Sequence, residues 1–133
     1  MAFKTRESLD TNVILRLVLR DVPEQCLKIQ DLLMRMYIRY DVADLAITEA
    51  VYVLQKQYTR AEIVEHLERV LDLPNINANF ALWARVFPAF LEHPQLSFND
   101  CCLAAYAELN ESEPLWTFDK KLAVESGTAK LVR

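Results

Sequence analysis

The sequence predicts an α/β fold of three layers (α/β/α), in which helices cover both faces of a central, mostly parallel sheet. Apolar stretches of strand length alternate along the chain with segments whose apolar residues recur at helical spacing, which is typical of parallel sheets with crossover helices. The chain has 133 residues, 53% of them hydrophobic, so it can form the core of one domain of ordinary size. No internal repeat, linker or low-complexity tract divides it. We therefore expect a single domain over residues 1–133.

The individual elements follow from apolar spacing and from residues that start or stop helices. Asp21 with Pro23 marks one helix start, and Thr59 with Glu62 forms a capping-box pattern. We expect strands at 3–9, 44–48, 75–78, 114–118 and 129–132, and helices at 12–19, from 23 to about 40, at 49–54, from 60 to before Pro74, at 80–87, from 98 to about 109, and at 120–125. The first strand is unusually charged for a buried parallel strand.

Composition excludes several classes of function. Gly127 is the one glycine, so glycine-rich phosphate-binding loops are excluded. The formal net charge of −4 argues against a non-specific basic nucleic-acid binder, although bound cations can reverse the local sign in a nuclease. Three cysteines and two distant histidines indicate free thiols and no zinc site. The N-terminus lacks a signal peptide and no apolar run is long enough to span a bilayer, so we expect a soluble, cytoplasmic protein.

Four acids occupy comparable places in the predicted fold. Asp10, Glu49 and Asp119 each follow a predicted strand, and Asp100 lies in the first turn of a predicted helix. The carboxyl ends of the strands form one edge of an open α/β sheet, where ligands bind. We therefore expect these acids to share one edge.

Each acid also has a purely structural explanation. Asp10 can cap a helix, Glu49 can favour a helix N-terminus, Asp100 can complete a capping box begun by Ser97, and Asp119 can start a turn. Carboxylates crowded together repel one another, so a cluster of them persists best around a cation. An all-carboxylate donor set fits a hard ion, Mg²⁺ or Mn²⁺.

Four motifs carry a resemblance to a known family: residues 9–15 (Leu-Asp-Thr-Asn-Val-Ile-Leu), 48–54, 98–107 and 115–122 (Leu-Trp-Thr-Phe-Asp-Lys-Lys-Leu). In order and spacing they resemble the PIN-domain family, and most of all the VapC-type toxins of prokaryotic toxin–antitoxin pairs. The resemblance implies that Asp10, Glu49, Asp100 and Asp119 bind metal, with Asn12 and Thr117 in supporting positions. It also implies metal-dependent endoribonuclease activity, homodimers and an antitoxin partner.

Other side chains are candidates for contact with RNA. Arg16, Arg20, Lys120 and Lys121 can reach backbone phosphates, although solvated surface charge is the commoner role of such residues. Trp83 and Trp116 can stack on bases, but we expect both to lie in the core.

Two rival functions fit parts of the pattern. A non-catalytic interaction module with a PIN-like fold is disfavoured because all four acids are present. A phosphatase with an aspartate nucleophile also begins with an acid after the first strand, but it usually needs a second aspartate where this chain has Asn12. A phosphoacceptor receiver domain is also disfavoured, because the chain lacks the paired acids near the first strand that such a domain needs.

Overall fold

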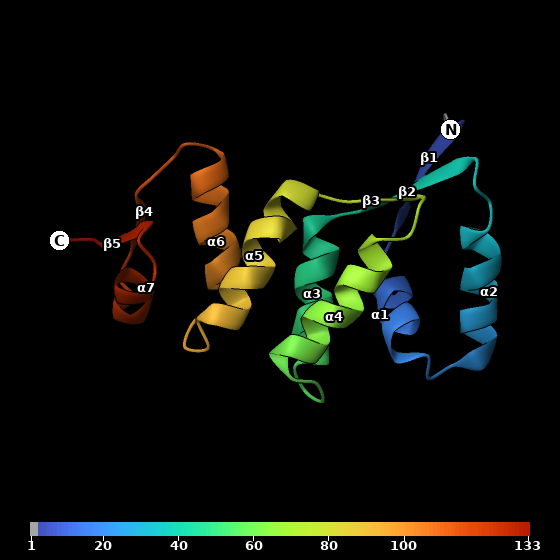
Figure 1. Cartoon of the computed structure of the whole chain (residues 1–133), viewed down its shortest axis with the longest axis horizontal. Coiled ribbons are helices and arrows are strands. Elements are labelled where there is room, and N and C mark those ends of the chain that lie inside the picture. The colour runs from blue at the N-terminus through green and yellow to red at the C-terminus, as the bar shows by residue number, and fades with distance from the viewer. Residues whose placement is uncertain (1–2) are drawn as a thin grey trace. The chain divides into compact units, whose positions relative to one another are not determined.

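The computed structural model describes residues 3–133, and Met1 and Ala2 of the predicted domain lie outside the described residues. The chain forms two compact units, residues 1–79 and residues 80–133, which we call the N-terminal and C-terminal units (Figure 1). No helix within residues 3–133 has the length and apolar character that a bilayer crossing requires.

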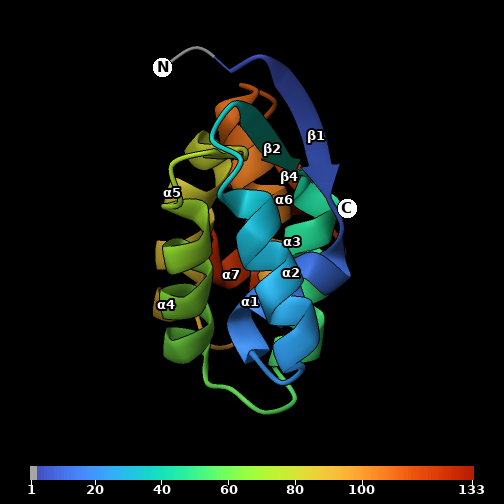
Figure 2. The ribbon, with the colours of Figure 1, turned by 90° about the vertical axis from the view of Figure 1, so that its right-hand side faces the viewer.

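The N-terminal unit joins a small parallel sheet to a set of helices. Its elements are, in chain order, β1 (Thr5–Leu9), α1 (Thr11–Leu19), α2 (Pro23–Leu33), β2 (Ile38–Val42), α3 (Asp44–Leu54), α4 (Arg60–Leu71) and β3 (Ile76–Asn77). The strand order is β1-β2-β3 and both pairings are parallel, with Leu9 opposite Val42 at the carboxyl ends of β1 and β2. Figures 1 and 2 both place α1–α4 below the strands.

Strand β2 alternates between a buried and a polar face, which explains how the helices pack on it. Ile38, Tyr40 and Val42 are buried, whereas Arg39 and Asp41 point to the other face. The Tyr40 hydroxyl donates to the carbonyl of Leu32 (2.8 Å), so its one polar group is satisfied within the core. The central strand is therefore fixed in register by its apolar face.

Two predictions for this unit are wrong. The strand expected at 44–48 is the start of α3, and Leu45, which was expected to be buried in it, is 67% exposed. The helix expected to reach about residue 40 ends at Leu33, and β2 follows it at 38–42. The predicted strands at 3–9 and 75–78 are confirmed as β1 and β3.

A polar cluster on the face of the sheet opposite Ile38, Tyr40 and Val42 links the three strands. The Asp41 carboxylate accepts hydrogen bonds from Arg6 on β1 (2.7 and 3.1 Å) and from Asn77 on β3 (2.9 Å). Arg39 lies 3.5 Å from the same carboxylate. Desolvation acts to raise the pKa of Asp41, but the hydrogen bonds from Arg6 and Asn77 and the charges of both arginines outweigh it and hold the pKa below 3.8.

This cluster predicts a pH-dependent loss of stability in Asp41→Asn. A folded-state pKa below the unfolded one contributes stability above pH 3.8, and that contribution is lost as the pH falls through the folded value. We expect the variant to lose about 1–2 kcal/mol of unfolding free energy at pH 7, because hydrogen bonds to a charged acceptor become hydrogen bonds to a neutral one. The loss is not larger because water partly screens the charge of Arg6. Urea unfolding at pH 7 and pH 3 should show this difference shrinking in acid. Asp31→Asn, an exposed acid on α2, should change little at either pH, and an equal loss at both pH values for Asp41→Asn would contradict the prediction.

The C-terminal unit pairs two long helices and adds a second small parallel sheet. Its elements are α5 (Phe80–Glu92), α6 (Phe98–Leu109), β4 (Leu115–Thr117), α7 (Lys120–Glu125) and β5 (Ala129–Leu131). β4 and β5 are parallel, and Leu115 lies opposite Ala129. The predicted strands at 114–118 and 129–132 are thus confirmed, as are the helices after Ser97 and at 120–125. Parallel strands in both units confirm the predicted α/β class.

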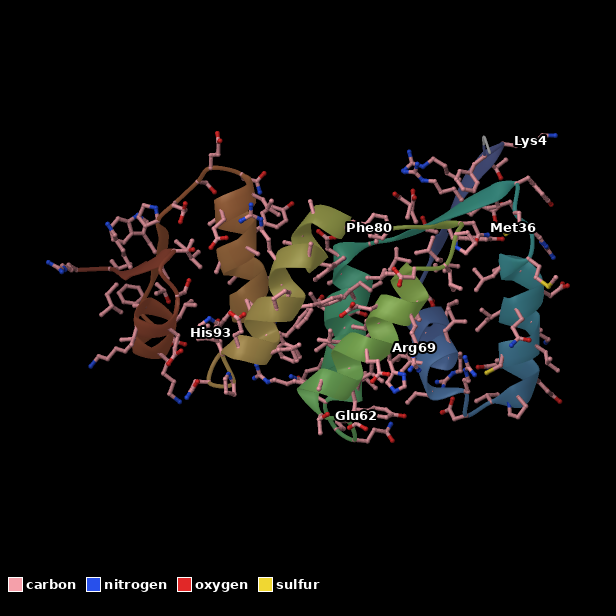
Figure 3. All side chains as sticks on the ribbon, viewed as in Figure 1. Lys4, Met36, Glu62, Arg69, Phe80 and His93 are labelled. Atoms are coloured by element: carbon pink, nitrogen blue, oxygen red, sulfur yellow. The ribbon has the colours of Figure 1, made fainter. Side chains whose placement is uncertain are left out.

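Polar links join the helices of this unit to its sheet region. His93, labelled at the end of α5 in Figure 3, lies 3.1 Å from the carboxylate of Glu125 at the end of α7. Glu108 on α6 accepts from Arg85 on α5 (3.0 Å) and from the hydroxyl of Thr128 just before β5. These contacts connect α5 and α6 to the segment that carries Asp119.

Candidate active site

Asp10 directly follows β1 and begins α1. Its Oδ1 accepts a hydrogen bond from the backbone N–H of Val13 (3.2 Å), so the helix-capping explanation of this residue is correct. The cap uses one carboxylate oxygen, and the residue is exposed. Capping therefore fixes the carboxylate at the carboxyl end of β1 and leaves the second oxygen for another partner.

Glu49 lies in the second turn of α3, and its predicted place just after the second strand is wrong. The helix begins earlier than expected, at Asp44, so Thr48 is inside it and its hydroxyl bonds to the carbonyl of Leu45 (2.9 Å). The Glu49 carboxylate accepts a hydrogen bond from the Thr11 hydroxyl (2.9 Å). Because Thr11 is next to Asp10 in the chain, this bond brings Glu49 to the start of α1, beside Asp10.

Asp119 repeats in the C-terminal unit the arrangement of Asp10. It follows β4 after one intervening residue and caps α7, and its Oδ1 accepts from the backbone N–H groups of Lys121 (2.9 Å) and Leu122 (3.2 Å). The hydroxyl of Thr117 accepts from the Asp119 backbone N–H (2.9 Å). Thr117 thus contacts the backbone of Asp119.

Asp100 is the third residue of α6 and completes a capping box with Ser97. Its Oδ2 accepts from the Ser97 backbone N–H (3.3 Å), and the Ser97 hydroxyl accepts from the Asp100 N–H (3.0 Å). The structural explanation proposed for this residue is correct. As with Asp10 and Asp119, one oxygen serves the helix.

The four acids divide evenly between the two units, with Asp10 and Glu49 in one and Asp100 and Asp119 in the other. Within either unit, the described residues include no group of three His, Cys, Asp or Glu side chains placed to hold a metal ion. Their donor atoms are carboxylate oxygens, and the three capping acids each leave one oxygen outside the cap. This chemistry fits a hard divalent cation and does not fit a soft one.

Sequence reasoning missed two polar residues near the first two acids. Thr11 holds Glu49, and the only signal for it was its place between Asp10 and Asn12. Asp44 occupies the position after β2 that was assigned to Glu49, and its carboxylate accepts from Asn79 (3.2 Å). Correct placement of β2 from its alternating apolar residues would have drawn attention to Asp44.

The candidate substrate contacts differ in their surroundings. Arg16 forms an ion pair with Asp21, and its hydrogen bond lowers the pKa of that carboxyl, whereas Arg20 ends α1 with a left-handed backbone. Lys120 and Lys121 are exposed in the first turn of α7.

Trp83 is buried as predicted. Trp116 is 61% exposed, so its predicted place in the core is wrong.

The fold and the site together define an α/β domain with three of the four acids at the starts of helices and an oxygen-only donor set. The family model described as the PIN domain matches residues 8–124, and this chain belongs to the PIN-domain family. The match includes all four acids and confirms both the resemblance seen in the motifs and the α/β class with three layers. PIN domains are generally nucleases, which supports a nuclease role for this chain in general terms.

Solved structures with chains similar to this one include VapBC2 and PAE2754. VapBC2 from Rickettsia felis, solved bound to a DNA fragment from their promoter, has 15% identity and a TM-score of 0.41, covering 96% of this chain and 97% of that one. PAE2754 from Pyrobaculum aerophilum has 22% identity and a TM-score of 0.35, covering 99% of this chain and 85% of that one. Among curated proteins, no sequence matches significantly.

Proposed function

We propose that this chain is a Mg²⁺- or Mn²⁺-dependent endoribonuclease that hydrolyses RNA phosphodiester bonds in the cytoplasm. The observation that carries the proposal is the complete set of Asp10, Glu49, Asp100 and Asp119 within the PIN-domain match. A member that had kept only the fold for protein interaction would be free to lose one of these acids. We further propose that the four carboxylates act together on one substrate phosphate.

In this proposal the four acids hold the cation through carboxylate oxygens. When bound, the cation supplies the chemistry of hydrolysis by lowering the pKa of the attacking water and stabilising charge on the phosphate and the leaving oxygen. The chain itself orients the carboxylates. The cap of α1 restrains Asp10, the cap of α7 restrains Asp119, and the hydroxyl of Thr11 restrains Glu49.

Neighbouring residues complete the proposed site. Asn12 is exposed in the first turn of α1 and would support a ligand carboxylate, and Thr117 positions the backbone of Asp119. Lys120 and Lys121 would contact backbone phosphates of the RNA next to Asp119. Arg16 is a weaker candidate, because it already has a carboxylate partner, and Arg20 is exposed at the end of α1.

The biological role that fits this activity is that of the toxin in a type II toxin–antitoxin pair. This assignment extends the resemblance of the four motifs to VapC-type toxins. It implies an antitoxin that masks the site and a homodimer of the toxin. Co-expression with the product of an adjacent small gene, followed by co-purification, would test the partner.

The activity itself is tested by cleavage of RNA with and without a divalent cation. Purified protein should cleave a mixture of structured RNAs and labelled single-stranded oligoribonucleotides in millimolar Mg²⁺ or Mn²⁺. EDTA should abolish the cleavage, because it removes the cation that would activate the attacking water. Gel electrophoresis of the products measures cleavage both with the cation and in EDTA.

Two outcomes would count against the proposal. Cleavage that survives EDTA would show chemistry independent of a cation. Absence of cleavage with either ion would favour the non-catalytic interaction module.

A further inference from the structure

The C-terminal unit exposes two large aromatic side chains immediately before Asp119. Trp116 is 61% exposed and Phe118 is 82% exposed. Soluble proteins normally bury most of the surface of such side chains, and neither residue contributes to the aromatic core of this unit. We call Trp116 and Phe118 the aromatic pair.

The geometry of the small sheet places Trp116 on its outer face. Trp116 lies opposite Lys130 in the parallel register, so the two side chains share one face of the sheet. Both are exposed, whereas Ala129, which points the other way, is buried. Phe118 lies just after β4, at a bend of the backbone, and its side chain is exposed as well.

The segment that carries the aromatic pair, residues 114–133, is basic in an acidic chain. Residues 114–133 contain four Lys or Arg residues and two acids, a net charge of +2, although the whole chain has −4. Lys120, Lys121, Lys130 and Arg133 are exposed, and none of the four forms an ion pair within residues 3–133. Their charges are therefore available to an anionic partner.

An open hollow of about 1230 Å³ lies beside Trp116. Val124 and Leu131 supply apolar surface to it, and Lys130 and Arg133 supply cations. Apolar and aromatic surface interleaved with cations is the arrangement by which proteins bind single-stranded nucleic acid, since bases stack on the rings and phosphates meet the charges. A protein partner would need instead an acidic surface with apolar anchors.

We infer that Trp116 and Phe118 stack unpaired bases of an RNA strand and position the adjacent phosphate at Asp119. This inference rests on the proposed function, because it gives the aromatic pair a role in binding the substrate of that activity. The pair selects single-stranded segments, since the bases of a duplex have no free face to offer. Lys130 and Arg133 contact the phosphates that flank the stacked bases.

The test is binding of a fluorescein-labelled single-stranded oligoribonucleotide, measured by anisotropy in EDTA so that the strand stays intact. We expect Trp116→Ala and Phe118→Ala each to weaken binding about tenfold, the effect typical of one lost base–aromatic contact. Trp116→Phe should retain most of the affinity. Tyr106→Ala, which removes a 52% exposed aromatic on α6, is the matched control and should bind like wild type.

A fluorescence measurement separates stacking from a structural effect. Trp83 and Trp116 are the two tryptophans, so Trp83→Phe leaves only the exposed one as a reporter. Titration with the single strand should quench its emission, and a duplex of the same sequence should quench it far less. Equal quenching by both would overturn the inference.

The remaining outcomes distinguish this inference from the proposed function. If wild type cleaves RNA with a cation but the aromatic variants bind single strands normally, the inference fails and the function stands. If the variants lose affinity but wild type never cleaves, the inference stands as RNA binding and the nuclease proposal fails. If the variants keep RNA affinity and instead change the molecular mass measured by light scattering, the pair is a protein contact and the inference is overturned.

Discussion

Asp10→Asn is expected to lower cation-dependent RNA cleavage by at least about a hundredfold and to leave the fold intact. Loss of a residue that only supports a metal ligand typically costs about 10- to 100-fold, so loss of a ligand charge should cost at least that much. The fold should survive because asparagine caps helices as well as aspartate does. The amide oxygen of the introduced asparagine can still accept the bond from the Val13 N–H that Asp10 accepts now.

Initial cleavage rates at saturating Mn²⁺ measure the loss, and urea unfolding measures stability. Asp31→Asn is the matched control, because it removes one negative charge from an exposed site on α2. The control should cleave like wild type. The free energy of unfolding of both variants should lie within about 0.5 kcal/mol of the wild-type value. Full activity in Asp10→Asn would refute the proposed role of this acid.

The same experiment on Asp119 tests whether acids from both units serve one site. Asp119→Asn should cost as much activity as Asp10→Asn. Residues that act as a unit show strongly non-additive losses, so the double variant should be little worse than either single variant. Multiplied losses would mean that the two acids act independently, and the proposal of a shared phosphate would then be wrong.

The chemistry of the helix starts explains why much of the chain could be predicted from the sequence. Thr59 with Glu62 and Ser97 with Asp100 form the reciprocal bonds that their spacing predicts. Such bonds involve residues three apart and need no information from the rest of the fold. Asp10 was placed correctly for the same reason, since a cap lies directly next to the element that it begins.

The segment around β2 was predicted wrongly because local pattern does not distinguish its alternatives. Leu45, Ala46 and Ile47 form a short apolar run, which suits a buried strand or a buried helix equally well. Here α3 buries Ala46 and Ile47 and exposes Leu45, which is a helical pattern. The alternation of Ile38, Tyr40 and Val42 was a stronger strand signal than the apolar run at 45–47. The helix predicted from residue 23 was extended to about residue 40, however, and it covered the start of this alternation.

The charged first strand has a physical explanation that the sequence alone did not offer. Within the sheet of the N-terminal unit, β1 is an edge strand, and Arg6 meets the carboxylate of Asp41 on β2. Of its residues, only Leu9 is buried. The partner of Arg6 lies 35 residues away, so no local pattern could have revealed it.

Trp83→Ala is expected to cause the largest loss of stability among the substitutions considered. Trp83 is 2% exposed and stacks on Phe87 and Phe98, with ring centroids 5.7 and 5.8 Å away. Truncation of a buried tryptophan to alanine typically costs about 3–5 kcal/mol, because a large cavity remains. A domain of this kind has about 5–15 kcal/mol of stability in total, so the variant should lose a large part of it. The midpoint of urea unfolding should therefore fall steeply.

Two companion variants identify the cause of that loss. Trp83→Phe keeps an aromatic ring between Phe87 and Phe98 and removes an indole N–H that is buried without a hydrogen-bond partner among the described residues. Because an unpaired buried donor is unfavourable, its removal offsets part of the lost volume, and we expect a loss below about 1.5 kcal/mol. Trp116→Ala removes the exposed tryptophan and should change stability by less than about 0.5 kcal/mol. Similar losses for Trp83→Ala and Trp116→Ala would show that the aromatic stack around α5 and α6 is not the core of the C-terminal unit.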